Sequence, residues 1–131
     1  MYTIPVQSHA RTELIDITAE VQKTLKQSGI KDGLVCVYVP HTTAAVTINE
    51  NADPSVQADI LKSINKLIPL SDNYTHSEGN SAAHIKATLF NSSATVIVES
   101  SRLQLGTWQS IFFCEFDGPR TRSVWVKVMG A

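Results

Sequence analysis

Short runs of β-branched and aromatic residues recur along the chain and constrain its fold more than any other feature. The clearest are residues 33–40 (GLVCVYVP), 94–100 (ATVIVES), 108–116 (WQSIFFCEF) and 120–130 (RTRSVWVKVMG). Residues 2–9, 12–17, 45–50 and 84–90 are predicted to be extended as well. Such runs are typical of β-strands, and all are far shorter than the roughly 20 apolar residues that cross a membrane as a helix. The chain is therefore predicted to be mostly β-sheet.

Two segments in the first half carry helical signals. Residues 19–29 follow Thr18, a good N-cap, and end at Gly29, a typical helix stop. Asp53 and Pro54 are typical of the start of a second helix. Its apolar positions form one stripe, namely Val56, Ile60, Ile64 and Leu67. A length of 131 residues fits one domain. We therefore predict a single α+β domain, residues 1–131, with an antiparallel β-sandwich core and two helices in its first half.

The composition is that of an ordinary globular protein, with 43% hydrophobic and 18% charged residues and a net charge of −1. Because there is no basic stripe and no polybasic tail, neither nucleic acid nor a membrane surface is an expected partner. The first residues show no signal-peptide pattern, and Cys36 and Cys114 lie in apolar runs. We therefore expect reduced core thiols in a cytoplasmic protein.

Three of the four histidines lie in polar segments beside predicted strands. His41 follows Pro40 at a strand end, and His76 and His84 bracket the polar end of a long loop over residues 70–83. Three neutral imidazoles that meet at one point could hold a divalent metal, zinc or magnesium, and leave a fourth position for water. Alternatively, His41 hydrogen-bonds a hydroxyl of the HTT turn, His76 is solvated and His84 begins a strand. The spacing of the histidines does not decide between the two.

Glu115 interrupts the apolar run FFCEF, so its carboxylate is expected to be partly buried and to need a partner. Arg120, Arg122 or a histidine could supply that partner. Asp117 falls on the same face of the strand as Glu115. Glu115 is interpreted either as a general acid or base, or a group that orients one, or as half of a structural ion pair beside the turn at 117–120.

Arginines and one tryptophan complete the candidate residues. Arg102, Arg120 and Arg122 could present donors to a phosphate or carboxylate group. Trp108 follows a Gly-Thr turn and is either a core aromatic at a strand start or a lid over a planar ligand. Neither the P-loop nor the Rossmann glycine motif is present, so no nucleotide-binding fold is implied.

Three longer segments of the sequence resemble a known family. They are HTTAAVTINENADPSVQADI (41–60), HSEGNSAAHIKATL (76–89) and GTWQSIFFCEFDGPRTRSV (106–124). They look like the signature segments of the YjbQ-like family, a group of small uncharacterised cytoplasmic proteins. The likeness is collinear from about residue 4 to about residue 129.

The resemblance implies a compact α+β sandwich assembled as a homotrimer, with a polar pocket at or near the subunit interface where histidines gather. Carried over by motif, the metal-site residues are His41, His76 and His84, and the catalytic residues are Asn49, Glu50, Glu115 and Arg120. The implied binding residues are Arg102, Trp108, Gln109, Asp117 and Arg122. Ser101 stands where the family pattern has glycine, which puts the turn beside Arg102 in doubt.

The family is linked to a weak thiamine-phosphate synthase activity. This implies a transferase that joins a pyrimidine diphosphate to a thiazole phosphate and expels pyrophosphate. Arginines and a divalent ion would neutralise the leaving group, with histidine and glutamate as proton carriers. One alternative is metal-assisted hydrolysis with Glu115 as the base, and another is a non-catalytic trimeric module that binds a metal or a ligand. The expected partners are further copies of the chain and, for an enzyme, a small phosphorylated metabolite.

Overall fold

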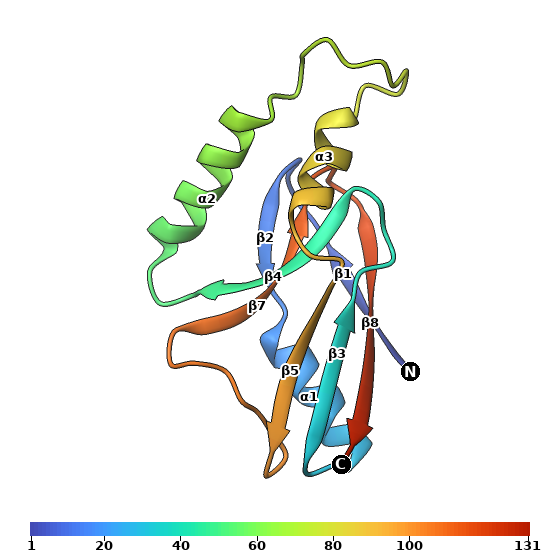
Figure 1. The fold of residues 1–131 in the computed structure, drawn as a ribbon, viewed down its shortest axis with the longest axis vertical. Coiled ribbons are helices and arrows are strands. Elements are labelled where there is room, and N and C mark those ends of the chain that lie inside the picture. Colours follow the sequence, from blue (N-terminus) through green and yellow to red (C-terminus); the bar gives the residue numbers. More distant parts are fainter.

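Two antiparallel sheets pack face to face and three helices surround them (Figure 1). The computed structural model describes residues 1–131. The five-stranded sheet has the order β1 (Tyr2–Gln7), β8 (Thr121–Gly130), β3 (Gly33–Tyr38), β5 (Ser93–Glu99) and β6 (Arg102–Leu103). The three-stranded sheet has the order β2 (Glu13–Asp16), β7 (Gln109–Glu115) and β4 (Ala44–Glu50). The helices are α1 (Thr18–Ser28), α2 (Pro54–Leu67) and α3 (Ser81–Leu89). The α+β sandwich is confirmed.

The inner faces of the two sheets form one core of 16 buried residues, to which α1 adds Val21 and Leu25. A second, smaller cluster lies on the other face of the three-stranded sheet and consists of Ala45, Ala83, Cys114 and Phe116. Ala83 belongs to α3, so this helix covers the outer face of β7 and β4. Because β7 is buried on both faces, its sequence is almost continuously apolar.

The helix starts differ in how far they match the sequence signals. Asp53 caps α2 as predicted, since its carboxylate accepts the Ser55 N–H at 2.9 Å. Thr18 is the first residue of α1 rather than its cap, and its N–H donates to the Asp16 carboxylate at 2.9 Å. The Thr18 hydroxyl oxygen instead accepts the Ile111 N–H at 2.8 Å. The threonine therefore fastens α1 to β7.

The third helix corrects the prediction of a strand over residues 84–90. Residues 81–89 are α3, so His84 lies on a helix and the preceding loop ends at Asn80 rather than at Ala83. The buried positions Ala82, Ala83 and Lys86 follow helical spacing, and alanine is the strongest helix former. The Asn80 carbonyl accepts the first helical N–H groups, from Ala83 at 3.0 Å and His84 at 3.3 Å. The strand prediction gave too much weight to Ile, Thr and Phe in a short window.

The cysteine thiols are both free, as predicted. Cys114 is buried between β7 and α3, whereas Cys36 is half-buried rather than a full core residue. None of the three helices is both long and apolar enough to cross a membrane.

Candidate functional site

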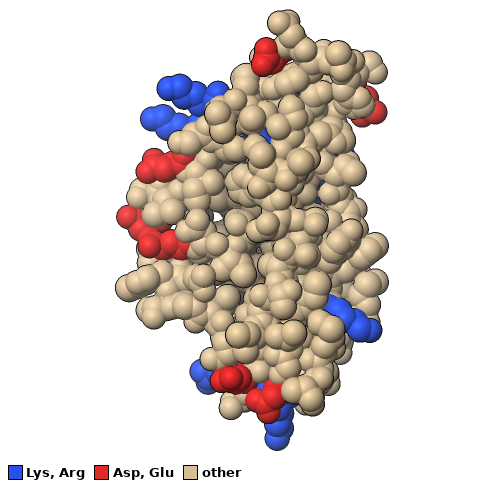
Figure 2. All heavy atoms as spheres, in the orientation of Figure 1, with Lys and Arg blue, Asp and Glu red and all other residues tan.

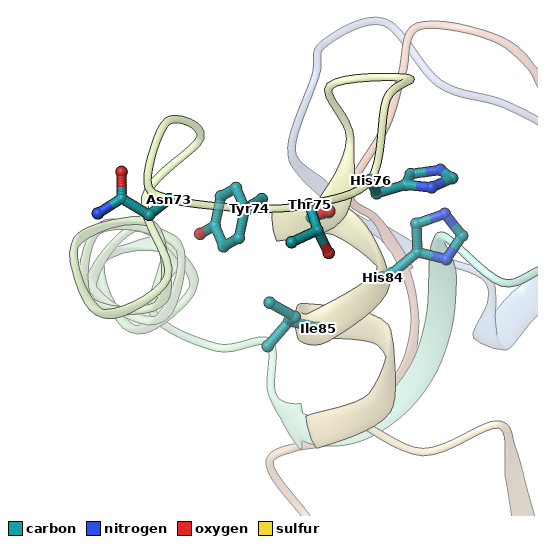
Figure 3. A pocket seen from close by; sticks show the side chains of 7 residues that line it. Asn73, Tyr74, Thr75, His76, His84 and Ile85 are labelled. Atoms are coloured by element: carbon teal, nitrogen blue, oxygen red, sulfur yellow. The ribbon is translucent and has the colours of Figure 1, made fainter.

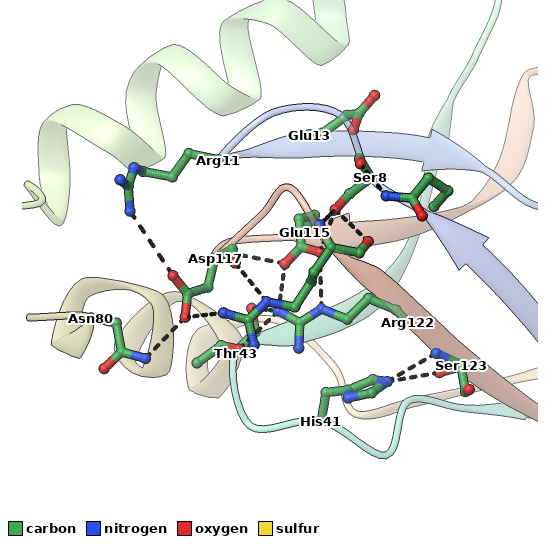
Figure 4. Close-up of polar contacts among 12 residues, drawn as sticks. Ser8, Arg11, Glu13, His41, Thr43, Asn80, Glu115, Asp117, Arg122 and Ser123 are labelled. Carbon is green, nitrogen blue, oxygen red and sulfur yellow. Dashed lines mark hydrogen bonds and ion pairs between the residues drawn. The ribbon is translucent and has the colours of Figure 1, made fainter. Parts of the chain in front are cut away.

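A buried ion pair joins the two sheets at one end of the sandwich. Glu115 ends β7 in the three-stranded sheet, and Arg122 lies near the start of β8 in the five-stranded sheet. Their side chains are 0% and 3% exposed. Arg122 donates from Nε to Glu115 Oε1 at 2.9 Å and from Nη2 to Glu115 Oε2 (Figure 4). The partner expected for Glu115 is therefore Arg122, and the turn at 117–120 links two sheets rather than a hairpin.

Further donors and acceptors complete this ion pair. The Ser8 hydroxyl donates to Glu115 Oε1 at 2.8 Å, and the Asp117 N–H donates to Oε2 at 3.0 Å. Arg122 Nη2 also donates to the Thr43 hydroxyl at 2.9 Å. Arg122 Nη1 makes no hydrogen bond within the chain, although the side chain lines an open cavity. The Nε and Nη2 edge of the guanidinium is thus fixed, and Nη1 has no hydrogen-bond partner within the chain.

The protonation state of Glu115 follows from these contacts. Burial by itself raises the pKa of this carboxyl. Hydrogen bonds from Arg122, the Asp117 amide and Ser8, together with the Arg122 charge, outweigh burial and hold its pKa below the ordinary value. A charged carboxylate whose two oxygens are occupied is poorly suited to exchange protons with a substrate. The geometry favours an orienting role for Glu115, and its predicted catalytic role stays a prediction.

All three candidate histidines line one cavity of about 480 Å³ beside Arg122. The other lining residues are Pro40, Thr42, Thr43, Glu78, Asn80, Asp117, Arg120 and Arg122. They come from the segment after β3, the segment before α3, α3 itself and the β7–β8 connection. The cavity is therefore built from chain ends that the sandwich brings together, and it is almost entirely polar.

His41 is held by the backbone of β8. Its Nε2 lies 3.0 Å from the Ser123 N–H, which donates to it. Pairing between β3 and β8 stops at Tyr38 and Trp125, and the His41 ring takes the Ser123 N–H beyond that point. Partial burial lowers the pKa of His41, and the Arg122 charge lowers it further. A hydrogen bond from the protonated ring to the Ser123 carbonyl raises the pKa but does not outweigh these two effects. The shorter contact, from the Ser123 N–H to Nε2, assigns the proton of the neutral ring to Nδ1.

His76 and His84 lie next to each other at the junction of two hollows. Their ring centroids are 5.4 Å apart and the rings meet edge to face (Figure 3). Glu78 Oε1 lies 3.9 Å from His76 Nε2. On the side away from His41, a second hollow of about 430 Å³ is lined by Tyr74, Thr75 and Ile85 among others. The two imidazoles therefore face both spaces.

Asp117 links Arg120 to the start of α3. Its Oδ2 accepts Arg120 Nη2 at 3.2 Å and the Asn80 side-chain amide at 2.9 Å. Asn80, Thr43 and Ser8 were not among the predicted site residues. The HTT turn was a signal for Thr43, but as a partner of His41, and no local pattern marks Ser8.

The other predicted site residues lie elsewhere. Glu50 pairs with Gln109 at the end of β4 opposite Glu115, about 20 Å away at the usual strand rise. Asn49 pairs with Ser110 beside them, and Trp108 is 63% exposed at the same end, so it is not a core aromatic. Arg102 lies at a third place, in a hollow with Gln22, Lys26, Ser100 and Ser101. Within one chain these residues do not join the histidine cavity.

The turn beside Arg102 keeps the shape that a glycine would favour. Ser100 and Ser101 have φ angles of 52° and 64°, which is the left-handed region. Ser101 thus accepts the backbone conformation of the glycine that it replaces in the family pattern.

The single chain does not present a three-donor metal site. No group of three His, Cys, Asp or Glu side chains lies in position to hold a metal ion. His41 contributes to the same cavity as His76 and His84, but its Nε2 is engaged by Ser123. Within the chain His41 Nε2 is thus already engaged, and a metal shared by the three histidines stays a prediction.

Comparison with known proteins identifies the family to which this chain belongs. Residues 2–131 match the family model described as UPF0047 protein YjbQ-like. The chain belongs to the YjbQ-like family. It is 50% identical over 130 residues to a UPF0047 protein of Methanocaldococcus jannaschii, covering 99% of this chain and 94% of that one. It is 50% identical over 129 residues to the UPF0047 protein YugU of Bacillus subtilis, covering 98% of each.

Solved structures of YjbQ-like proteins have the same fold. An uncharacterised member of the YjbQ/UPF0047 family from Clostridium acetobutylicum is 50% identical, with a TM-score of 0.97 over 98% of this chain and 100% of that one. A protein of unknown function from Sulfolobus solfataricus is 35% identical, with a TM-score of 0.94 over 99% of this chain and 96% of that one. The family and the fold are thus established.

The tautomer and the pKa of His41 give a direct check on this geometry. We expect nitrogen NMR to show the neutral ring protonated at Nδ1, because Nε2 accepts the Ser123 N–H. We also expect its titration midpoint below the ordinary value of 6.5, because burial and Arg122 disfavour the charged ring. A neutral ring protonated at Nε2, or a midpoint above 6.5, would contradict the placement of His41.

Proposed function

We propose that the chain is a subunit of a small homotrimeric enzyme that binds a phosphorylated metabolite in the histidine cavity. One observation carries the proposal: His41, His76, His84, Arg120 and Arg122 line the same cavity of about 480 Å³. Pockets of about 300–1,000 Å³ are the usual size for small metabolites. Imidazoles titrate near neutral pH whereas guanidinium groups stay charged, so the cavity combines proton carriers with fixed positive charge.

The arginines and His41 would bind the phosphate. The free Nη1 edge of Arg122 and the half-exposed side chain of Arg120 offer charged donors. His41 adds an Nδ1–H donor because its other nitrogen is engaged by Ser123. Three donors that stand ready before the ligand arrives suit an anion such as a phosphate or diphosphate.

A transferase explains the two adjacent hollows better than a hydrolase does. A transferase must hold two substrates on either side of the reacting atoms, and His76 and His84 stand between hollows of about 480 and 430 Å³. In thiamine-phosphate synthesis the nitrogen of the thiazole phosphate attacks the methylene carbon of the pyrimidine diphosphate. The carbon–oxygen bond breaks no later than the carbon–nitrogen bond forms, and pyrophosphate leaves with the bonding electrons. A protonated histidine would give its proton to the leaving pyrophosphate.

Metal-assisted hydrolysis and non-catalytic binding remain the competing proposals. A zinc or magnesium ion held by His76 and His84 would need a further donor from another copy or from the substrate. A module that only binds an anion would use the arginines without proton transfer. The cytoplasmic location also stays a prediction.

The histidines can be tested against the fourth histidine of the chain. We expect purified protein to release pyrophosphate from the pyrimidine diphosphate only when thiazole phosphate is present. His76→Ala and His84→Ala should each lower kcat by about 10²–10⁴-fold, since general acid catalysis contributes that much. His9→Ala is the matched control because His9 is 75% exposed on a loop outside both hollows. Equal loss in His9→Ala, or turnover untouched by all three changes, would rule out this role.

The same preparations distinguish the competing proposals. Hydrolysis of the diphosphate without the thiazole, abolished by a chelator and restored by zinc or magnesium, would support the hydrolase. Saturable diphosphate binding without any turnover would support the non-catalytic module.

The outer face of the five-stranded sheet supports the trimeric part of the proposal. No helix of the chain covers this face, and its large apolar side chains are exposed: Leu34, Tyr38, Ile97, Trp125 and Met129. Figure 2 shows few charged side chains on this face, although the exposed Lys127 lies on it between Trp125 and Met129. A group of large exposed apolar side chains on one face often marks an interface.

This face adjoins the histidine cavity. Tyr38 and Trp125 stack at 5.8 Å between ring centroids, two residues from Pro40 and Ser123. A neighbouring copy seated there would come close to His41. The separate residues Asn49, Glu50, Arg102, Trp108 and Gln109 would contribute to the reaction only if another copy brings them to the cavity.

Assembly can be measured directly. We expect light scattering after size exclusion to give the mass of three chains at micromolar concentration. Ile97→Lys should dissociate the assembly, because it places a charge at the centre of the apolar face, where Ile97 is 56% exposed. Leu67→Lys is the control, since Leu67 is 70% exposed on α2, away from that face. A monomeric parent protein, or a trimer that Ile97→Lys leaves intact, would refute the assignment.

A further inference from the structure

A lysine lies on the buried face of α3. Lys86 follows Ala82 and Ala83 at helical spacing and is only 4% exposed. Its Nζ donates to one group, the side-chain oxygen of Asn65 on α2, at 2.7 Å. An ammonium has three N–H donors, so two remain unused. Burying a charged amine costs free energy unless other groups compensate for it.

No acidic group compensates for the Lys86 charge. No carboxylate oxygen lies within 4.0 Å of its Nζ. The charged neighbour that influences it is Arg11, which has the same sign. Burial lowers the pKa of Lys86, and the Arg11 charge lowers it further. The fold thus holds a buried cation beside a second cation and supplies no anion between them.

A separate cavity of about 230 Å³ opens at this lysine. It lies between α2, α3 and the segment that joins β1 to β2, and its walls include Arg11, Asn65, Lys86 and Phe116. It shares only Asn80 and Asp117 with the histidine cavity. Arg11 and Asn80 approach Asp117 on the side away from His41 (Figure 4).

Asp117 does not neutralise this cavity. Its Oδ2 already accepts Arg120 and Asn80, and its Oδ1 lies 4.0 Å from Arg11 Nη1, at the limit of an ion pair. Two cations therefore face the space against one carboxylate that is shared with a third cation. A small anion would balance the charge and accept the unused Lys86 donors.

We propose that the cavity formed by Arg11, Asn65 and Lys86 is a binding site for one small oxyanion, the carboxylate or phosphate group of a metabolite. Lys86 binds the oxyanion with its two free N–H groups, and Arg11 closes the site from the solvent side, where its side chain is 57% exposed. Asn65 orients the ammonium. The site is distinct from the histidine cavity and does not depend on the reaction proposed there.

Titration with inorganic phosphate and, separately, with acetate tests the site in the full chain. We expect saturable amide and side-chain NMR shifts at Asn65 and Lys86 with at least one of the two anions. The anion that binds more tightly identifies the group. Lys86→Met should weaken this binding about 10- to 100-fold, because it removes a charged donor and keeps the length of the side chain. Lys23→Met, at an exposed position of α1 outside the cavity, should leave binding unchanged.

A second variant guards against misfolding of Lys86→Met. Arg11→Gln changes an exposed side chain and should weaken binding several-fold. Binding of neither anion at Asn65 and Lys86 would overturn the proposal. It would also be overturned by shifts that survive both Lys86→Met and Arg11→Gln, or by shifts confined to His76 and His84. The last result would leave the proposed function standing.

Discussion

The ion pair between Glu115 and Arg122 is the interaction on which the rest of the site depends. It lies where β7 of one sheet and β8 of the other come together, and both side chains are shielded from solvent. Removing two charges from water is costly, and attraction offsets that cost only when the geometry is good and the remaining atoms are bonded. Ser8, the Asp117 amide and Thr43 supply those bonds. The pair therefore fixes how the two sheets meet at this end of the sandwich.

The shape of the cavity follows from the same contact. Glu115 holds the Nε and Nη2 edge of Arg122, so this contact also fixes the place of the guanidinium in the cavity wall. The connection from β7 to β8 must also pass close to the segment that follows β1. A Cβ at Gly118 would lie 2.3 Å from the Ala10 carbonyl oxygen and 2.7 Å from the Ser8 hydroxyl, so only glycine fits there. The positions of Asp117 and Arg120 are consequences of this packing.

Local sequence patterns predicted the features of the fold that depend on interactions between residues close together in the chain. The strands and the Asp53 cap follow from alternation and from hydrogen bonds within a few residues. Helix α3 was missed because its alanines and Asn80 were weighed less than its β-branched residues. Of the site, burial of Glu115 and its arginine partner were predictable, since a carboxylate inside an apolar run needs a cation. The contact with Ser8, 107 residues away, and the separation of Glu50 from the histidines depend on how the sheets pack, which no local pattern encodes.

A double-mutant cycle on the ion pair tests the account most directly. Urea unfolding of the parent, Glu115→Gln, Arg122→Met and the double variant should be compared at pH 7 and one protein concentration. The pKa of Glu115 is lower in the folded chain than its unfolded value of 4.5. The contribution of its charge to folding stability is therefore fully present above pH 4.5, and it is lost as the pH falls through the pKa of the folded state. Each single change should cost about 3–5 kcal/mol by leaving a buried charge unpaired, and the double change should cost much less than their sum. Additive losses, or single losses within about 0.5 kcal/mol of zero, would contradict the claim that this pair holds the site together.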